Sequence, residues 1–198
     1  MPDLVGDAVP RQTAGDADAI PPRSGGPVTW LPVAAPGVDP LDRVFGLRPN
    51  LYEDFRRWSA LFWEEGLLDP TLLELCRLRV AQLHGCESEL RVRHRSALAA
   101  GLTEEKIAAL PRASSDPAFS ELERACLAFA ELFVADPNAI TDEDARRVTE
   151  PLGPEGTVAL VQALALFDGF ARFRLMLGVD PPSPDRVVVL DDPGAAPD

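Results

Sequence analysis

The amino-acid sequence predicts an all-α fold of about six to eight helices, and three observations lead to this prediction. Apolar residues make up 46% of the 198 residues, which is enough for one hydrophobic core of ordinary size. Over residues 41–180 these apolar residues recur at helical spacing, and proline, glycine and capping residues separate the runs. Alternation of the kind that marks strands is almost absent.

Local signals place the ends of the first helices. Pro49 suits the first turn of a helix that ends just before Gly66. The next helix is expected to begin after Asp69, its N-cap, and to stop at Gly85. A third helix is expected over about residues 86–100.

The second half of the chain carries similar signals. Thr103 is expected to cap a short helix. The run Ser120-Glu121-Leu122-Glu123 has the form of a capping box and opens a longer helix. Two further helices are expected, one over about residues 141–149 and one over about residues 154–177.

An irregular segment is expected on each side of this helical domain. Residues 1–40 carry scattered proline, glycine and aspartate without periodicity, and we interpret them as an N-terminal arm. Residues 181–198 have a similar character and are interpreted as a C-terminal tail. Within that tail, the apolar run Val187-Val188-Val189-Leu190 could pair or pack against another part of the chain.

Charge and composition exclude several classes of function. The formal net charge of −13 repels phosphate backbones and anionic headgroups, so neither nucleic acid nor a membrane is expected as a partner. The sequence shows no signal peptide and no apolar stretch of the ~20 residues that span a bilayer, which predicts a cytoplasmic protein. The three cysteines form no CxxC, and no Cys/His spacing suits a metal site, so neither a disulfide framework nor a metal is expected.

A string in the middle of the chain resembles a known family. Residues 74–86 read ELCRLRVAQLHGC and residues 99–107 read AAGLTEEKI. With their flanks, these residues resemble the carboxymuconolactone decarboxylase and alkylhydroperoxidase D-like family over roughly residues 45–178. The resemblance implies the helical bundle of that family and a homo-oligomer, commonly a trimer or a hexamer.

The redox motif of that family is incomplete in this sequence. In the redox branch, a Glu is followed twelve residues later by CxxC, and a His stands four residues past the second Cys. Glu74 and Cys86 match the first two positions, whereas Glu89 replaces the second Cys. Arg93 stands at the position of the His, and His94 follows one residue later. Cys-x-x-Glu is characteristic of the branch that resembles 4-carboxymuconolactone decarboxylase, although that branch also carries the His.

These residues suit acid–base chemistry better than thiol redox chemistry. A thiol peroxidase needs a resolving thiol near Cys86, and only Cys76 or Cys126 could supply one. Glu74 and Glu89 are the candidates for proton transfer, since carboxylates can serve as general acids or bases. Cys86 is the third candidate catalytic residue, as a thiolate stabilised at a helix N-terminus or as a polar wall.

Arg93 and His94 are the candidate substrate-binding residues. If residues 86–100 form one helix, Arg93 lies on the same face as Glu89 and can pair with it or hold a substrate carboxylate. On that helix His94 points about 140° away from Glu89, so it is a poor substitute for the missing His.

Each of these residues also has a purely structural interpretation. Glu89 could complement a helix N-terminus, and Arg93 could be its partner on the surface. Glu74 could pair with a neighbouring arginine on its own helix, and Cys86 could be a small core residue.

The leading hypothesis is a cofactor-independent acid–base enzyme of the decarboxylase, lyase or isomerase type. Its substrate would be a small anionic organic acid or a biosynthetic intermediate, which would fit a role in secondary metabolism. A non-catalytic scaffold or binding member of the family is one alternative, and a thiol-dependent peroxidase is the other.

Overall fold

The computed structural model describes most of the helical domain and a short segment beyond it. The described residues are 31, 40–64, 66, 68–179 and 187–190. The predicted N-terminal arm and most of the predicted C-terminal tail therefore lie outside the described residues.

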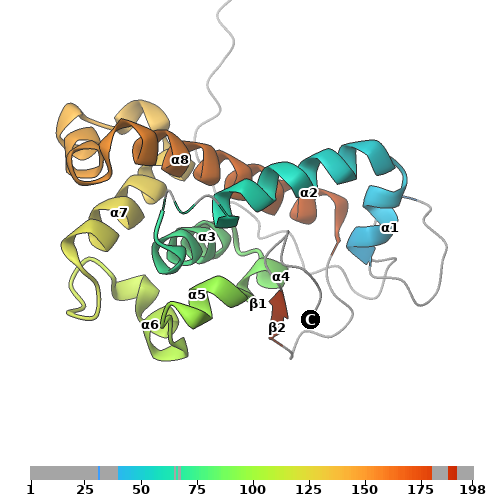
Figure 1. The fold of residues 1–198 in the computed structure, drawn as a ribbon, viewed down its shortest axis with the longest axis horizontal. Coiled ribbons are helices and arrows are strands. Elements are labelled where there is room, and N and C mark those ends of the chain that lie inside the picture. Colours follow the sequence, from blue (N-terminus) through green and yellow to red (C-terminus); the bar gives the residue numbers. More distant parts are fainter. Residues whose placement is uncertain (1–30, 32–39, 65, 67, 180–186, 191–198) are drawn as a thin grey trace, which may run out of the picture.

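Eight α-helices make up most of the described part of the chain (Figure 1). In chain order the elements are α1 (Pro40–Gly46), α2 (Pro49–Glu64), α3 (Pro70–His84), α4 (Glu87–Leu90), β1 (Val92–His94), α5 (Arg95–Ala99), α6 (Glu104–Ala109), the 3-10 helix η1 (Leu110–Arg112), α7 (Glu121–Ala135), the 3-10 helix η2 (Pro137–Ala139), α8 (Asp142–Leu177) and β2 (Val188–Leu190). The predicted fold class is confirmed, with one pair of short strands in addition.

Helix α3 lies at the centre of the fold. It packs against α7 and α8, which also pack against each other. The Asp69 side chain accepts a hydrogen bond from the backbone N–H of Leu72 at 3.1 Å, and Gly85 ends the helix in the left-handed conformation. Both ends agree with the prediction. Because α3 is buried over most of its length, neighbouring helices surround it on nearly all sides.

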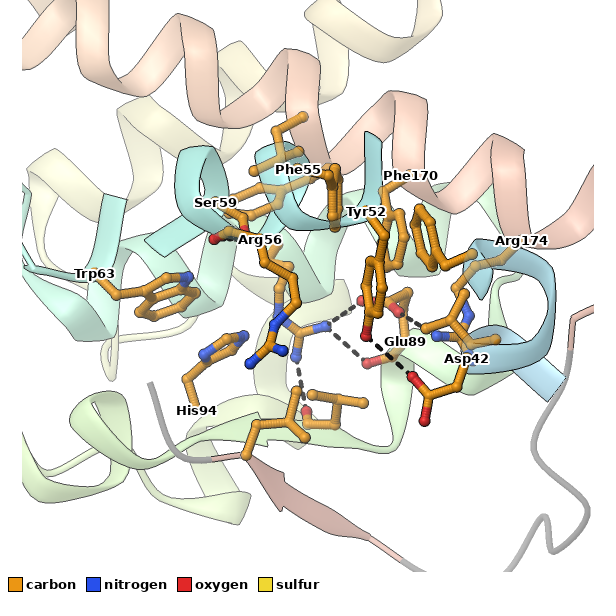
Figure 2. A pocket seen from close by; sticks show the side chains of 17 residues that line it. Asp42, Tyr52, Phe55, Arg56, Ser59, Trp63, Glu89, His94, Phe170 and Arg174 are labelled. Atoms are coloured by element: carbon orange, nitrogen blue, oxygen red, sulfur yellow. Dashed lines mark hydrogen bonds and ion pairs between the residues drawn. The ribbon is translucent and has the colours of Figure 1, made fainter. Parts of the chain in front are cut away.

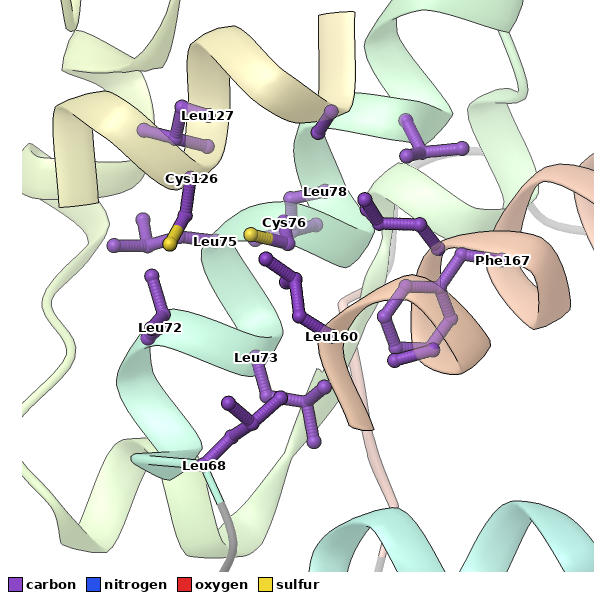
Figure 3. Close-up of a cluster of buried hydrophobic side chains, with 14 of the residues drawn as sticks. Leu68, Leu72, Leu73, Leu75, Cys76, Leu78, Cys126, Leu127, Leu160 and Phe167 are labelled. Carbon is purple, nitrogen blue, oxygen red and sulfur yellow. The ribbon is translucent and has the colours of Figure 1, made fainter. Parts of the chain in front are cut away.

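The hydrophobic core lies between α3, α7 and α8 (Figure 3). Leu73 of α3 and Leu160 of α8 are fully buried there. Cys76 and Cys126 are also fully buried, as small apolar residues of the core. Burial raises the pKa of Cys126 to about 12, so this thiol stays protonated at neutral pH.

Helix α8 joins the two helices predicted over residues 141–149 and 154–177. Gly153 interrupts it with φ 67° and ψ 177°, which places a kink between the two predicted segments. A residue with a side chain would be strained at this positive φ. Although α8 is long, no helix in the described part of the chain is long and apolar enough to cross a membrane.

The single helix predicted over residues 86–100 is wrong. The chain there forms α4, β1 and α5 in succession. Guanidinium groups satisfy backbone oxygens that a continuous helix would satisfy with its own N–H groups. Arg93 donates to the carbonyl oxygens of Leu90 and Val92 at 2.7 and 2.8 Å, and Arg77 donates to the carbonyl oxygen of Val92 at 2.7 Å. Hydrogen bonds from side chains thus replace the backbone hydrogen bonds of a continuous helix.

Strand β1 is also held by a distant part of the chain. It pairs in parallel with β2, so that Val92 lies opposite Val188 and His94 lies opposite Leu190. The backbone N–H of Val188 donates to the carbonyl oxygen of Arg91 at 2.8 Å. The apolar run at residues 187–190 therefore does pair with another segment, as the sequence allowed.

We predict that Leu160→Ala lowers the free energy of unfolding by about 2–5 kcal/mol, because the substitution leaves a cavity among α3, α7 and α8. Val158 lies on the same helix and is 57% exposed, so Val158→Ala is a matched control with an expected change within about 0.5 kcal/mol. Urea denaturation followed by circular dichroism measures both values. Equal losses in the two variants would contradict this account of the core.

Candidate active site

A cavity of about 450 Å³ lies beside the core (Figure 2). Helices α1, α2 and α8 supply most of its walls, and α3, α4 and the two strands supply the rest. Much of the lining is aromatic, from Phe45, Tyr52, Phe55, Trp63, Phe167 and Phe170. The volume falls within the range of about 300–1,000 Å³ typical of sites for small molecules.

Arg77 of α3 lies at the polar end of this cavity with all its donors in use. Its Nε and Nη2 donate to the carboxylate of Glu74 at 2.7 and 2.8 Å. Its Nη1 donates to both the backbone oxygen and Oε2 of Glu89, each at 2.9 Å, and Nη2 also reaches the carbonyl of Val92. An arginine has five N–H groups, so Arg77 has none left for a ligand.

Glu74 is fully buried behind Arg77 and does not line the cavity. Burial alone raises the pKa of this carboxyl. The charge and hydrogen bonds of Arg77, together with the backbone N–H of His94 at 3.3 Å, outweigh that effect and hold its pKa below the usual 4.5. Glu74 is therefore ionised at neutral pH and positions Arg77 and His94.

Glu89 of α4 does line the cavity, and two arginines hold its carboxylate. Oε2 accepts from Arg77 at 2.9 Å, and Oε1 lies 3.3 Å from Nη1 of Arg174. Each carboxylate oxygen has two acceptor sites, so Glu89 keeps sites that can take a proton or a hydrogen bond from a ligand.

Arg174 of α8 is a site residue that the sequence reasoning missed. Its Nε donates to the hydroxyl oxygen of Ser88 at 2.9 Å, and its guanidinium carbon lies 5.8 Å from the centre of the Phe170 ring. Its Nη2 has no hydrogen-bond partner among the described residues, so it can donate to a ligand. A signal was present in the sequence, since Arg174 continues the apolar face of Phe167, Phe170 and Ala171 at helical spacing.

Cys86 does not fit the predicted thiolate. It precedes the four-residue helix α4, is fully buried and does not line the cavity. Its sulfur lies 3.5 Å from the hydroxyl oxygen of Ser88. Burial raises the pKa of the Cys86 thiol, and the hydrogen bond with Ser88 offsets this only in part. The dipole of a helix with only four residues does not offset the loss of solvation that a Cys86 thiolate would suffer on burial.

The predicted positions of Arg93 and His94 are wrong because the two residues lie on a strand. Successive side chains of a strand point to opposite sides. Arg93 points away from the cavity and binds Glu104, with Nε to Oε1 at 2.8 Å and Nη2 to Oε2 at 3.0 Å. His94 lines the cavity, and its ring stacks on Trp63 with centroids 3.7 Å apart. His94 thus lines the same cavity as Glu89, whereas on a continuous helix it would point about 140° away from Glu89.

The α1–α2 side of the cavity carries polar residues that no motif marks. The Tyr52 hydroxyl donates to Asp42 at 3.0 Å, and the guanidinium carbon of Arg56 lies 5.8 Å from the centre of the Tyr52 ring. Arg56 has no carboxylate partner among the described residues. In the part of the chain that the structure describes, no group of at least three His, Cys, Asp or Glu side chains is arranged to hold a metal ion.

Comparisons with known proteins bear on this domain. Residues 49–132 match the model of the carboxymuconolactone decarboxylase family. These residues belong to the carboxymuconolactone decarboxylase family. The predicted family is thus confirmed, and the matched segment contains Glu74, Cys86 and Glu89. Arg174 lies beyond it, so residues outside the matched segment complete the cavity.

A solved structure shares the fold. It is a protein of unknown function from Agrobacterium tumefaciens, described as a candidate antioxidant defence protein AhpD. The two structures align with a TM-score of 0.59 and 17% sequence identity, covering 71% of this chain and 96% of the other. This likeness confirms the predicted alkylhydroperoxidase D-like bundle. No curated protein matches the chain.

We predict that Glu74 contributes stability that is lost in acid. Its folded pKa lies below the unfolded value of 4.5, so the contribution is fully present above that pH and disappears as the pH falls through the folded pKa. Glu74→Gln should remove this part of the pH dependence and also lower stability at pH 7 by about 3–5 kcal/mol, because Arg77 loses a buried partner. Urea denaturation between pH 3 and 7 measures both effects.

The matched control for that experiment is Glu143→Gln, since the Glu143 side chain is 64% exposed. This variant should keep the acid loss of the wild-type protein. An equally steep acid loss in Glu74→Gln would contradict the position assigned to Glu74.

We also predict that the three thiols react slowly in the folded protein, because all are buried and the pKa of Cys86 is raised. Titration with a disulfide reagent at pH 7.5 should show little reaction before unfolding and three thiols after it. The count after unfolding should stay the same when the folded protein has first been treated with peroxide. A reducible disulfide at Cys86 would instead support the peroxidase alternative.

Proposed function

We propose that this family member is a cofactor-independent acid–base enzyme that acts on an organic acid, with Glu89 as the group that transfers the proton. The observation that carries the proposal is the position of Glu89. Its carboxylate lies on the wall of an aromatic cavity, two arginines fix its orientation, and it keeps free acceptor sites.

The surrounding residues suit proton transfer at carbon. The Glu89 carboxylate can accept a proton from a carbon next to a carboxylate. The negative charge that develops on the substrate can be stabilised by the unpartnered Nη2 of Arg174. The His94 ring faces the same cavity and can position the substrate or donate to it. Double-bond migration and elimination begin with such a transfer. Decarboxylation instead breaks a C–C bond and ends with the reverse transfer, in which protonated Glu89 would deliver a proton to the carbon that lost CO₂.

The two alternatives fit the site less well. A thiol peroxidase that uses Cys86 requires a second thiol near it, whereas Cys86 packs with Ala81 and Ala171, apart from the core cluster that contains Cys76 and Cys126. A non-catalytic scaffold or binding protein could use the same cavity, but it would give Glu89 no role in turnover. A cytoplasmic location, a role in secondary metabolism and a homo-oligomer of three or six subunits remain parts of the proposal.

The proposal is tested by proton exchange, which does not require the product to be known. The protein is incubated in D₂O with a panel of carboxylic acids and lactones, and deuterium entry at the carbon beside the carbonyl is followed by NMR. Glu89→Gln should slow the exchange by at least ~100-fold, because general acid–base groups contribute about 10²–10⁴-fold.

Glu87→Gln is the matched control, because Glu87 lies on the same short helix and its side chain is 71% exposed. It should exchange at the wild-type rate. Equal exchange in the Glu89 and Glu87 variants would refute the role of Glu89. Binding of panel members without any exchange would favour the non-catalytic binding member.

A further inference from the structure

We infer that the cavity binds an aromatic monocarboxylate, with its ring against the aromatic side chains and its carboxylate on Arg174 and Arg56. This inference rests on the proposed function and names the substrate class for it. Three features of the cavity carry it, namely the arrangement of the rings, the unused guanidinium donors and the balance of charge.

The rings on the α1, α2 and α8 side lie nearly parallel to one another. Phe45 stacks on Tyr52 with centroids 4.4 Å apart and an interplanar angle of 13°. Phe45 and Phe170 are inclined by 17°, and Phe55 and Phe170 by 27° with centroids 5.0 Å apart. Because aromatic rings prefer offset stacks, the flat ring of a ligand can extend this stack of side-chain rings. A saturated ring fills similar space without that interaction.

A second pair of stacked rings bounds the cavity on its other side. Trp63 and His94 are inclined by only 9°, and Figure 2 shows them opposite Tyr52 and Phe170. Rings therefore line the cavity on two sides, with the Arg56 side chain between them. Such a space favours a flat apolar body, whereas a small polar acid would leave most of these surfaces in contact with water.

The carboxylate of the ligand has two donors available. Arg77 is excluded because its five N–H groups are already used. Arg174 keeps its Nη2, and Arg56 lies at the cavity without a carboxylate partner among the described residues. Since Arg174 is 3.3 Å from Glu89, a carboxylate on Arg174 brings the carbon between ring and carboxylate toward Glu89.

The charges around the cavity balance without a ligand, so a second ligand carboxylate is disfavoured more strongly than a first. Among the described residues, the buried network and the cavity lining together carry three positive and three negative side chains, which are Arg56, Arg77, Arg174, Asp42, Glu74 and Glu89. One ligand carboxylate can use Arg174 and Arg56. A second one would lie beside Glu89 or Asp42 without a cation of its own, which costs free energy in a partly desolvated site.

The test uses four ligands built on one scaffold. Isothermal titration calorimetry at pH 8 compares phenylacetate with cyclohexylacetate, phenylacetamide and phenylmalonate. Phenylacetate should bind tightest. Cyclohexylacetate should bind about two- to tenfold more weakly, because it lacks the ring stacking. Phenylacetamide should bind about tenfold more weakly without the charge, and phenylmalonate should also be weaker because of its second carboxylate.

Variants locate the carboxylate. Arg56→Gln and Arg174→Lys should each weaken phenylacetate binding by about tenfold, since each removes a charge-assisted hydrogen bond. Arg57→Gln and Arg172→Gln are the matched controls. Arg57 neighbours Arg56 on α2 but pairs with Asp54, and Arg172 lies near Arg174 on α8 but pairs with Asp168. Both controls should bind as the wild type does. Arg56 is exposed, so its variant reports on binding even if Arg174→Lys fails to fold.

The outcomes separate this inference from the proposed function. Equal or tighter binding of cyclohexylacetate or phenylmalonate overturns the inference, as does unchanged binding by Arg56→Gln. If the expected binding order holds but no benzylic deuterium exchange occurs, the inference stands and the acid–base function falls. If Glu89-dependent exchange occurs only on polycarboxylates that exclude phenylacetate, the function stands and the inference falls.

Discussion

The guanidinium of Arg77 is the contact on which the site depends. It joins α3 to α4 through Glu89 and to β1 through the carbonyl of Val92, while Glu74 of its own helix holds it from behind. Two carboxylates and two backbone oxygens thus meet one rigid, planar cation. Because every donor is used, the orientation of each partner is fixed by the same group.

Burial makes this arrangement expensive to disturb. Glu74 and Arg77 are almost without solvent, so either charge alone would cost several kcal/mol. On one side of this network lies the core formed by α3, α7 and α8, and on the other side lies the cavity. Arg77 links Glu89 to the core helix α3. Arg174 extends the network to α8, which carries both core residues and cavity residues. Glu89, the candidate proton-transfer group, is therefore held by side chains from α3 and α8, the two helices that carry much of the core.

Local sequence signals were sufficient where helix ends are local. Asp69, Gly85 and the capping box at Ser120 all act as the sequence predicts, because their hydrogen bonds join residues within a few positions. The segment over residues 86–100 could not be read this way. Its conformation depends on Arg77 and on β2, almost a hundred residues further on.

The residues of the candidate site also differ in whether local sequence or distant contacts determine their positions. Glu89 could be found from the spacing of a motif, and it lines the cavity. Residues 92–94 form a strand and not the predicted helix, so Arg93 and His94 point to opposite sides of the chain. Arg93 therefore points away from the cavity, and His94 lines it. Arg174 comes from a helix far along the chain, and only its place on an apolar face marks it. Helix α1, which was not predicted, completes the cavity.

The cavity has walls of two kinds, and this has a consequence for how such a protein can diversify. The polar end is anchored in the core, whereas α1, α2 and β2 contribute the side chains that would meet the body of a ligand. Substitutions in these peripheral elements change the shape of the space without opening a hole among α3, α7 and α8. The shape of the cavity can therefore change through many single replacements while Glu89, its two arginine partners and the packing of the core stay the same.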